Sequence, residues 1–204
     1  MDLVIDVGAN TGIFGKELRM AGYNGAIVSF EPLRDAFQIL SSVANQDPDW
    51  EVNNFALGQE NSKQEINISG NSHSSSILEM LDTHTNAEAS AAYIGKQEIE
   101  IRKLDTIFPE VAGKAKEIFL KIDTQGFEMN VLKGASNSLD MINTVQLEMS
   151  LHPLYSGQAL YNDIMSFFHQ RGYKLIDIDP GFADLRTGVL YQFDGIFRKS
   201  EQKP

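Results

Sequence analysis

Short apolar runs alternate with helix-period segments in the first third of the chain, and this alternation restricts the fold more than any other feature. Residues 3–7 and 26–30 are apolar runs typical of buried strands, and Phe14, Leu18 and Ala21 between them recur at helical spacing. A second helical stripe covers residues 36–44, with Pro32 suited to its first turn, and residues 50–57 predict a third strand. Strands that alternate with helices predict βαβ units and a parallel sheet.

The alternation returns in the second half of the chain. Residues 118–122 and 144–149 predict strands, and residues 127–135 and 164–168 predict the helices that follow them. The last two predicted strands, residues 173–178 and 189–197, are separated by a connection too short for a parallel crossover, which needs about a dozen residues. We therefore expect an α/β fold whose sheet is mostly parallel and ends in an antiparallel hairpin.

Between residues 58 and 116 this alternation stops. Residues 64–68 and 97–101 alternate between apolar and polar side chains, which predicts a pair of half-exposed strands. The serine-rich residues 69–76 follow the first of these strands; we favour a solvated flexible loop there, and a lid over a site is the alternative. We expect one domain over residues 1–204, with the strand pair and the serine-rich loop inserted at about residues 59–103.

Composition excludes several classes of protein. The chain has 17 Lys and Arg against 28 Asp and Glu, a net charge of −11 that disfavours nucleic acid and anionic lipid as partners. It has no cysteine, which excludes disulfides, thiolate zinc sites and a cysteine nucleophile. No window approaches the ~18 apolar residues of a membrane span. We expect a cytoplasmic protein without a membrane partner.

Residues 4–12 carry the most informative motif, an apolar strand that runs into a glycine-rich turn. Gly8 and Gly12 let the backbone approach a ligand closely, and Glu31 follows about twenty residues later, where an acidic side chain can bind a ribose. Phosphate-binding and dinucleotide-binding loops both require glycine at position 10, where this chain has Asn10. Asp6 would repel a pyrophosphate and attract an ammonium or sulfonium group. The turn therefore favours a ligand that has a ribose and a cation but no pyrophosphate.

Five motifs in order resemble those of the FkbM family of class I S-adenosylmethionine-dependent methyltransferases. They are residues 5–12, 30–32, 54–57, 104–105 and 120–128, so the resemblance spans roughly residues 3–150. It implies a Rossmann-like three-layer sandwich with a seven-stranded sheet and the cofactor over the carboxyl ends of the strands. The family usually has an acidic residue where this chain has Gln125.

The resemblance also implies how S-adenosylmethionine binds. Gly8, Asn10 and Gly12 would surround its methionine end, Glu31 would hold the ribose, and residues 54–56 would border the adenine. The whole predicted cofactor site consists of Asp6, Gly8, Asn10, Thr11, Gly12, Glu31, Pro32, Asn54, Phe55, Ala56 and Asp123.

Acid–base side chains near the carboxyl edge of the sheet are the catalytic candidates. Asp123 ends one predicted strand, Glu148 lies near the end of the next, and His152 and Tyr155 follow in a loop. We predict Asp123, Glu148 and His152 as catalytic residues. His152 is equally well explained as a loop histidine bonded to backbone, and Glu148 as a solvated strand end or a partner of His152. These three are also metal-ligand types, but no tight spacing motif supports a metal, and we predict none.

The resulting hypothesis is an S-adenosylmethionine-dependent methyltransferase. By family resemblance it methylates a hydroxyl group on a sugar or another small-metabolite acceptor. No Asn/Asp-Pro-Pro-Tyr or -Phe segment follows the predicted strand at residues 118–122, which disfavours methylation of DNA bases. Two alternatives stay open: an NAD(P)-dependent oxidoreductase on a Rossmann sheet, and a non-catalytic S-adenosylmethionine-binding scaffold. The sequence leaves the acceptor and the oligomeric state undetermined.

Overall fold

A seven-stranded sheet forms the centre of the computed structural model, which describes residues 1–200. Its strand order is β3-β2-β1-β7-β8-β10-β9, and only β10 runs against the others. The bounds are β1 (Leu3–Val7), β2 (Ala26–Phe30), β3 (Trp50–Asn53), β7 (Ile118–Ile122), β8 (Thr144–Ser150), β9 (Tyr173–Pro180) and β10 (Gln192–Lys199). This confirms the predicted mostly parallel sheet with a terminal antiparallel hairpin.

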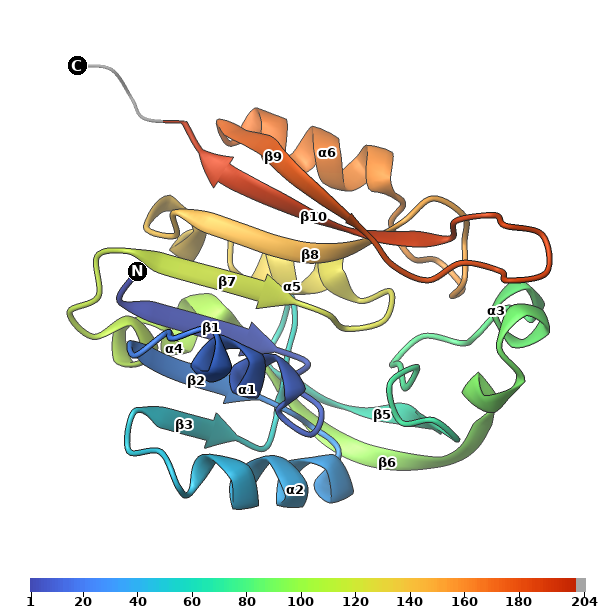
Figure 1. Cartoon of the computed structure of the whole chain (residues 1–204), viewed down its shortest axis with the longest axis horizontal. Coiled ribbons are helices and arrows are strands. Elements are labelled where there is room, and N and C mark those ends of the chain that lie inside the picture. The colour runs from blue at the N-terminus through green and yellow to red at the C-terminus, as the bar shows by residue number, and fades with distance from the viewer. Residues whose placement is uncertain (201–204) are drawn as a thin grey trace.

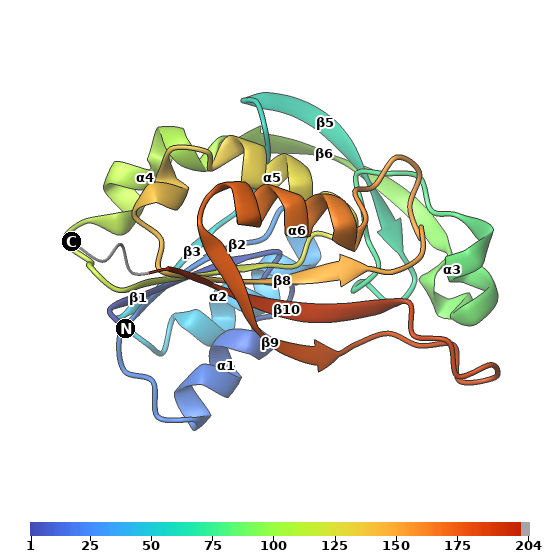
Figure 2. The same ribbon diagram turned by 90° about the horizontal axis from the view of Figure 1, so that it is seen from above.

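Helices cover both faces of this sheet, as Figure 2 shows. One face carries α1 (Ile13–Met20) and α2 (Arg34–Ala44). The other carries α4 (Leu104–Ala112), α5 (Glu128–Gly134) and α6 (Tyr161–Gln170), with the 3-10 turn η2 (Ser138–Asp140) after α5. All five residues of β1 are buried, because parallel strands covered on both sides have no solvent face. None of the helices in residues 1–200 is long and apolar enough to cross a membrane.

A smaller sheet lies beyond the carboxyl ends of the parallel strands (Figure 1). It has the order β4-β6-β5, with β4 (Ala56–Leu57), β5 (Ser62–Ser69) and β6 (Tyr93–Arg102). The chain between β5 and β6 contains α3 (Asp82–Ala87) and the 3-10 turn η1 (Ala89–Ala91). These elements place the insertion next to the edge of the main sheet where ligands of open α/β sheets bind.

The predicted strand at residues 50–57 is wrong, because the chain divides there into β3 and β4, which belong to different sheets. The Asn54 side-chain amide donates to the carbonyl oxygens of Glu31 (2.8 Å) and Pro32 (3.1 Å), and this turns the chain out of the main sheet. Pro32 is also not in the first turn of α2, which begins at Arg34 after an extended Leu33.

The serine-rich segment is not the solvated loop that we favoured. Ser74 and Ser76 are buried, and the Ser76 hydroxyl donates to the carbonyl oxygen of Gln125 at 2.7 Å. Asn67 in β5 exchanges two backbone hydrogen bonds with Ser76, so the loop folds back along its own strand. The segment therefore packs against the loop that follows β7 at the carboxyl edge of the main sheet, which is the position that the lid interpretation requires.

We expect Gly15→Ala to destabilise the protein, although alanine is the better helix former by roughly 1 kcal/mol. A Cβ at position 15 would lie 2.2 Å from the Trp50 ring, so α1 would have to move away from β3. Overpacking of this kind costs about 1–3 kcal/mol. Urea unfolding should show a lower free energy of unfolding for Gly15→Ala, while Lys16→Ala, at the exposed neighbouring position, should change it by less than about 0.5 kcal/mol. A more stable Gly15→Ala variant would contradict this packing.

Candidate functional site

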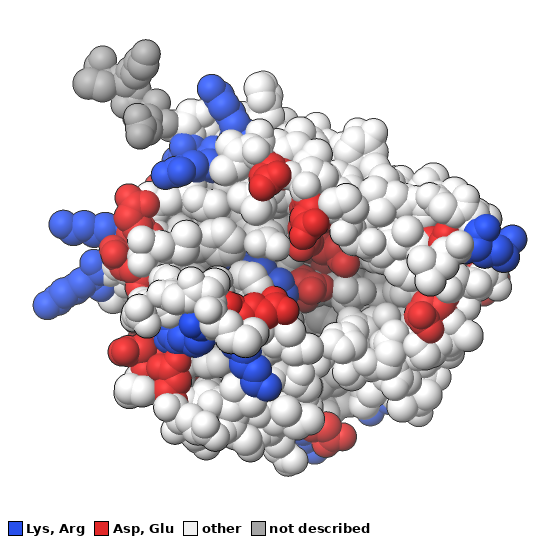
Figure 3. All heavy atoms as spheres, in the orientation of Figure 1, with Lys and Arg blue, Asp and Glu red and all other residues white. Residues whose placement is uncertain are grey.

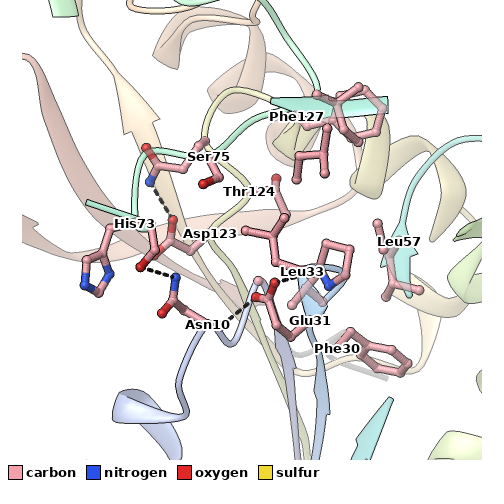
Figure 4. A pocket seen from close by; sticks show the side chains of 18 residues that line it. Asn10, Phe30, Glu31, Leu33, Leu57, His73, Ser75, Asp123, Thr124 and Phe127 are labelled. Carbon is pink, nitrogen blue, oxygen red and sulfur yellow. Dashed lines mark hydrogen bonds between the residues drawn. The ribbon is translucent and has the colours of Figure 1, made fainter. Parts of the chain in front are cut away.

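One pocket opens at the carboxyl ends of β1, β2 and β7, and the serine-rich segment forms part of its wall (Figure 4). The cleft is open, and its empty space, including solvent at the mouth, amounts to about 710 Å³. Its lining residues are Val7, Gly8, Asn10, Phe30, Glu31, Pro32, Leu33, Ala56, Leu57, Ile66, Ser72, His73, Ser75, Ile77, Asp123, Thr124, Gln125 and Phe127. Six of the predicted cofactor residues are among them: Gly8, Asn10, Glu31, Pro32, Ala56 and Asp123.

The turn after β1 needs its glycine for a reason that the sequence did not reveal. Gly8 has a φ of +79°, and a Cβ there would lie 1.8 Å from the carbonyl oxygen of Asp123. Gly8 therefore permits close contact between the ends of β1 and β7. Gly12 does not line the pocket: a Cβ on it would lie 2.8 Å from Leu40, so it allows α1 to pack on α2. Thr11 is also outside the lining, and its backbone N–H donates to Asn10 Oδ1.

Glu31 links the turn to the end of β2 (Figure 4). Its Oε2 accepts from the backbone N–H of Asn10, and its Oε1 accepts from the backbone N–H of Leu33, both at 2.8 Å. The side chain is buried, and burial raises its pKa to about 7 despite these two bonds. Each carboxylate oxygen keeps a second acceptor position, so Glu31 can still receive hydrogen bonds from a ligand.

Residues 54–56 shape the wall beside Glu31. Ala56 lines the pocket, whereas Asn54 binds the carbonyl oxygens after β2 from outside it. Phe55 is buried against Phe30, with ring centroids 5.3 Å apart. Asn54 and Phe55 thus support the pocket without lining it.

Lys121 lies between two carboxylates under the pocket. Its Nζ is 3.8 Å from Asp6 Oδ1 and 3.2 Å from Asp123 Oδ2. Burial raises the pKa of Asp6, whose Oδ1 has no hydrogen-bond partner among residues 1–200. Burial alone would lower the pKa of Lys121, but Asp123 and Asp6 reverse this and raise it. Asp6 does not line the pocket, but its carboxyl group lies beside Lys121 beneath the pocket floor.

Asp123 and Glu148 are joined through one side chain. Gln125 Nε2 donates to Asp123 Oδ1 at 2.8 Å and to Glu148 Oε2 at 3.0 Å. Burial and the nearby carboxylates of Asp123, Glu128 and Asp194 raise the pKa of Glu148. Asp123 lines the pocket, and Glu148 lies one hydrogen bond behind it. Figure 3 shows acidic side chains gathered along the hollow in this face.

His152 is not brought to this pocket. Its side chain is exposed, and its ring stands edge-on to Tyr191 at a centroid distance of 5.6 Å. Residues 1–200 contain no group of three or more His, Asp or Glu side chains arranged to hold a metal ion. His152 packs on Tyr191 and does not line the pocket.

Two parts of the site were missed by reasoning from the sequence. Gln125 was noted only as a departure from a family pattern, although its position two residues after Asp123 was a usable signal. The apolar lining at Leu33, Leu57 and Phe127 had no signal, because its spacing is that of ordinary core residues.

Comparison with known proteins yields a family and a fold. The family model described as the methyltransferase FkbM domain matches residues 6–175. The methyltransferase FkbM of Methylobacillus flagellatus KT superimposes with a TM-score of 0.58 at 16% identity, over 95% of this chain and 43% of that one. No curated protein matches the chain in sequence.

Two further solved structures share the fold. Magnesium protoporphyrin IX methyltransferase from Synechocystis PCC 6803, solved with bound SAM, has a TM-score of 0.52 at 12% identity, over 97% of this chain and 70% of that one. TehB from Haemophilus influenzae has a TM-score of 0.51 at 10% identity, over 97% of this chain and 57% of that one. The chain thus has the class I methyltransferase fold, and it spans less than half of the Methylobacillus protein.

We expect the stability contributed by Glu31 to depend on pH. Its pKa of about 7 in the folded chain exceeds the ordinary 4.5, so ionisation favours the unfolded chain. Relative to Glu31→Gln, the wild type should lose roughly 3 kcal/mol of unfolding free energy as the pH rises from 4.5 through 7. Urea unfolding at a series of pH values measures this difference. A difference between the wild type and Glu31→Gln that stays constant with pH would disprove the burial effect.

Proposed function

Because this chain belongs to the FkbM family of methyltransferases, we propose that it methylates a hydroxyl group of a sugar or another small metabolite, with S-adenosylmethionine as the methyl donor. The observation that carries the proposal is the placement of Glu31 and Asp123 in one pocket at the carboxyl ends of β1, β2 and β7. These carboxylates lie where a ribose and a reacting group would be bound at the edge of an open α/β sheet.

The pocket residues fit S-adenosylmethionine in three respects. Glu31 retains acceptor positions for ribose hydroxyls. Asp123 on the lining and Asp6 beneath it supply the negative charge that a sulfonium and an ammonium group require, and Asp6 Oδ1 has no hydrogen-bond partner among the described residues. The side chains of Leu57 and Phe127 provide an apolar wall for a flat base.

When bound, S-adenosylmethionine would supply a methyl group, which would pass from its sulfonium sulfur to an oxygen of the acceptor and leave S-adenosylhomocysteine. The protein must hold the acceptor in line and take up the proton of its hydroxyl group. Asp123 is the carboxylate that lines the pocket at the end of β7, and we assign the proton to it. Lys121, 3.2 Å from Asp123 Oδ2, orients this carboxylate. Glu148 does not line the pocket and is joined to Asp123 through the Gln125 amide.

We expect Gly8→Ala to weaken binding of S-adenosylhomocysteine at least about tenfold, or ~1.4 kcal/mol. The new methyl group would collide with the Asp123 carbonyl oxygen and separate the ends of β1 and β7. Gly22→Ala is the matched control, because Gly22 has a φ of +88° but a Cβ added there would meet no atom within 4 Å. Calorimetric titration of both variants and the wild type measures the affinities.

The same titration separates the cofactor hypotheses. We expect the wild type to bind S-adenosylhomocysteine and to bind neither NAD nor NADP. Binding of a nicotinamide cofactor alone would favour the oxidoreductase alternative and overturn the proposal. A Gly8→Ala variant with normal affinity would show that the turn after β1 does not shape the cofactor site.

We expect Asp123→Asn to reduce methyl transfer roughly 10²- to 10⁴-fold, the usual contribution of a general base. The measurement is transfer of a labelled methyl group into a panel of sugars and hydroxylated metabolites. Asp49→Asn, an exposed change at the far end of β3, is the control and should transfer at the wild-type rate. If the wild type binds the cofactor but methylates no member of the panel, the scaffold alternative is favoured.

A further inference from the structure

We propose that Gln125 is a positioning residue, whose side-chain amide holds Asp123 and Glu148 at a set spacing and excludes a further negative charge from between them. The inference rests on the proposed function, because it concerns the carboxylate assigned there as the proton acceptor. It goes beyond that proposal in giving a role to a residue that touches Asp123 directly.

The amide uses both of its hydrogens on this pair. One N–H donates to Asp123 Oδ1 (2.8 Å) and the other to Glu148 Oε2 (3.0 Å), so the two carboxylates are bridged by a single nitrogen. A glutamate at this position would have no hydrogen to donate when ionised. A shorter amide would not reach both carboxylates from the same backbone position. Glutamine is therefore the side chain that this geometry requires.

Tyr155 determines which way the amide points. The buried Tyr155 hydroxyl donates to Gln125 Oε1 at 2.8 Å, so the oxygen end of the amide faces the tyrosine and the nitrogen end faces the carboxylates. The Tyr155 ring is itself held against Gly126, where a Cβ would lie 3.0 Å from the ring. Ser76 donates to the Gln125 carbonyl oxygen and thereby anchors its backbone, which has a φ of +53°. Packing and hydrogen bonds thus fix both the backbone and the side chain.

The charges around the amide explain why it must be neutral. The cluster contains five carboxylates, one cation and one phenol from six parts of the fold: Asp6 (β1), Lys121 and Asp123 (β7 and its end), Glu128 (α5), Glu148 (β8), Asp194 (β10) and Tyr155 (the loop before α6). The amides of Gln192 and Gln146 donate to Glu148 and Asp194. A carboxylate at position 125 would lie between the carboxyl groups of Asp123 and Glu148. Because like charges disfavour ionisation, one of the three would then keep a proton.

Carboxyl ¹³C NMR across a pH titration tests this without an acceptor. We expect Gln125→Glu to raise the apparent pKa of Glu148 further, by about one unit or more. Gln125→Asn keeps an amide and suits a positive φ, but is too short to bridge the pair, so it should raise the pKa by a smaller amount. Gln38→Glu adds the same charge at an exposed position of α2 and should shift neither signal. Asp123→Asn and Glu148→Gln spectra assign the two signals.

The outcomes separate this inference from the proposed function. If the Gln125→Glu and Gln125→Asn titrations coincide with that of the wild type, Gln125 does not control the pair and the inference is wrong. The Asn variant keeps this test decisive even if the Glu variant does not fold. Titration of the wild type with S-adenosylhomocysteine is independent of these variants. Failure of the wild type to bind S-adenosylhomocysteine would overturn the proposed function. The pKa changes in the Gln125 variants would still test the role of Gln125 separately.

Discussion

The close contact between Gly8 and the carbonyl oxygen of Asp123 sets the geometry of the site. It brings together the ends of β1 and β7, which pair in parallel up to Val7 and Ile122. The backbone N–H of Gly8 also donates to the Phe30 carbonyl oxygen, so the end of β2 joins the same point. Because no side chain separates these three strand ends, a pocket forms beside them. Glu31 and Asp123, which directly follow β2 and β7, line its wall.

An excess of carboxyl groups over cations is the second property of this region. Burial raises the pKa of Glu31 and of Glu128 to about 7, and Lys121 is the cation that directly contacts Asp6 and Asp123. Such a site costs folding free energy when its carboxyl groups ionise. These carboxyl groups favour a cationic ligand. They also explain why the neutral amides of Gln125 and Gln192, and not further carboxylates, contact Asp123 and Glu148.

Residues at strand ends were the most predictable part of the site. Glu31 and Asp123 directly follow buried apolar strands, and parallel strands bring such positions to one edge. Predictions based on loops were poorer. Asn54 and Phe55 support the wall instead of lining it, and His152 lies outside the pocket, because the path of a loop depends on contacts that its own residues do not encode.

Apolar periodicity in the sequence by itself determined the order of strands and helices along the main sheet, because burial on one or two faces imposes a local spacing on the side chains. The short connection between the last two strands determined the antiparallel hairpin. The tertiary structure alone decided that the serine-rich segment packs on the pocket and that Gln125 bridges two carboxylates. Those hydrogen bonds join Gln125 to Ser76, Glu148 and Tyr155, partners 49, 23 and 30 residues away. Contacts across such separations leave no local pattern, since they depend on how complete elements pack together.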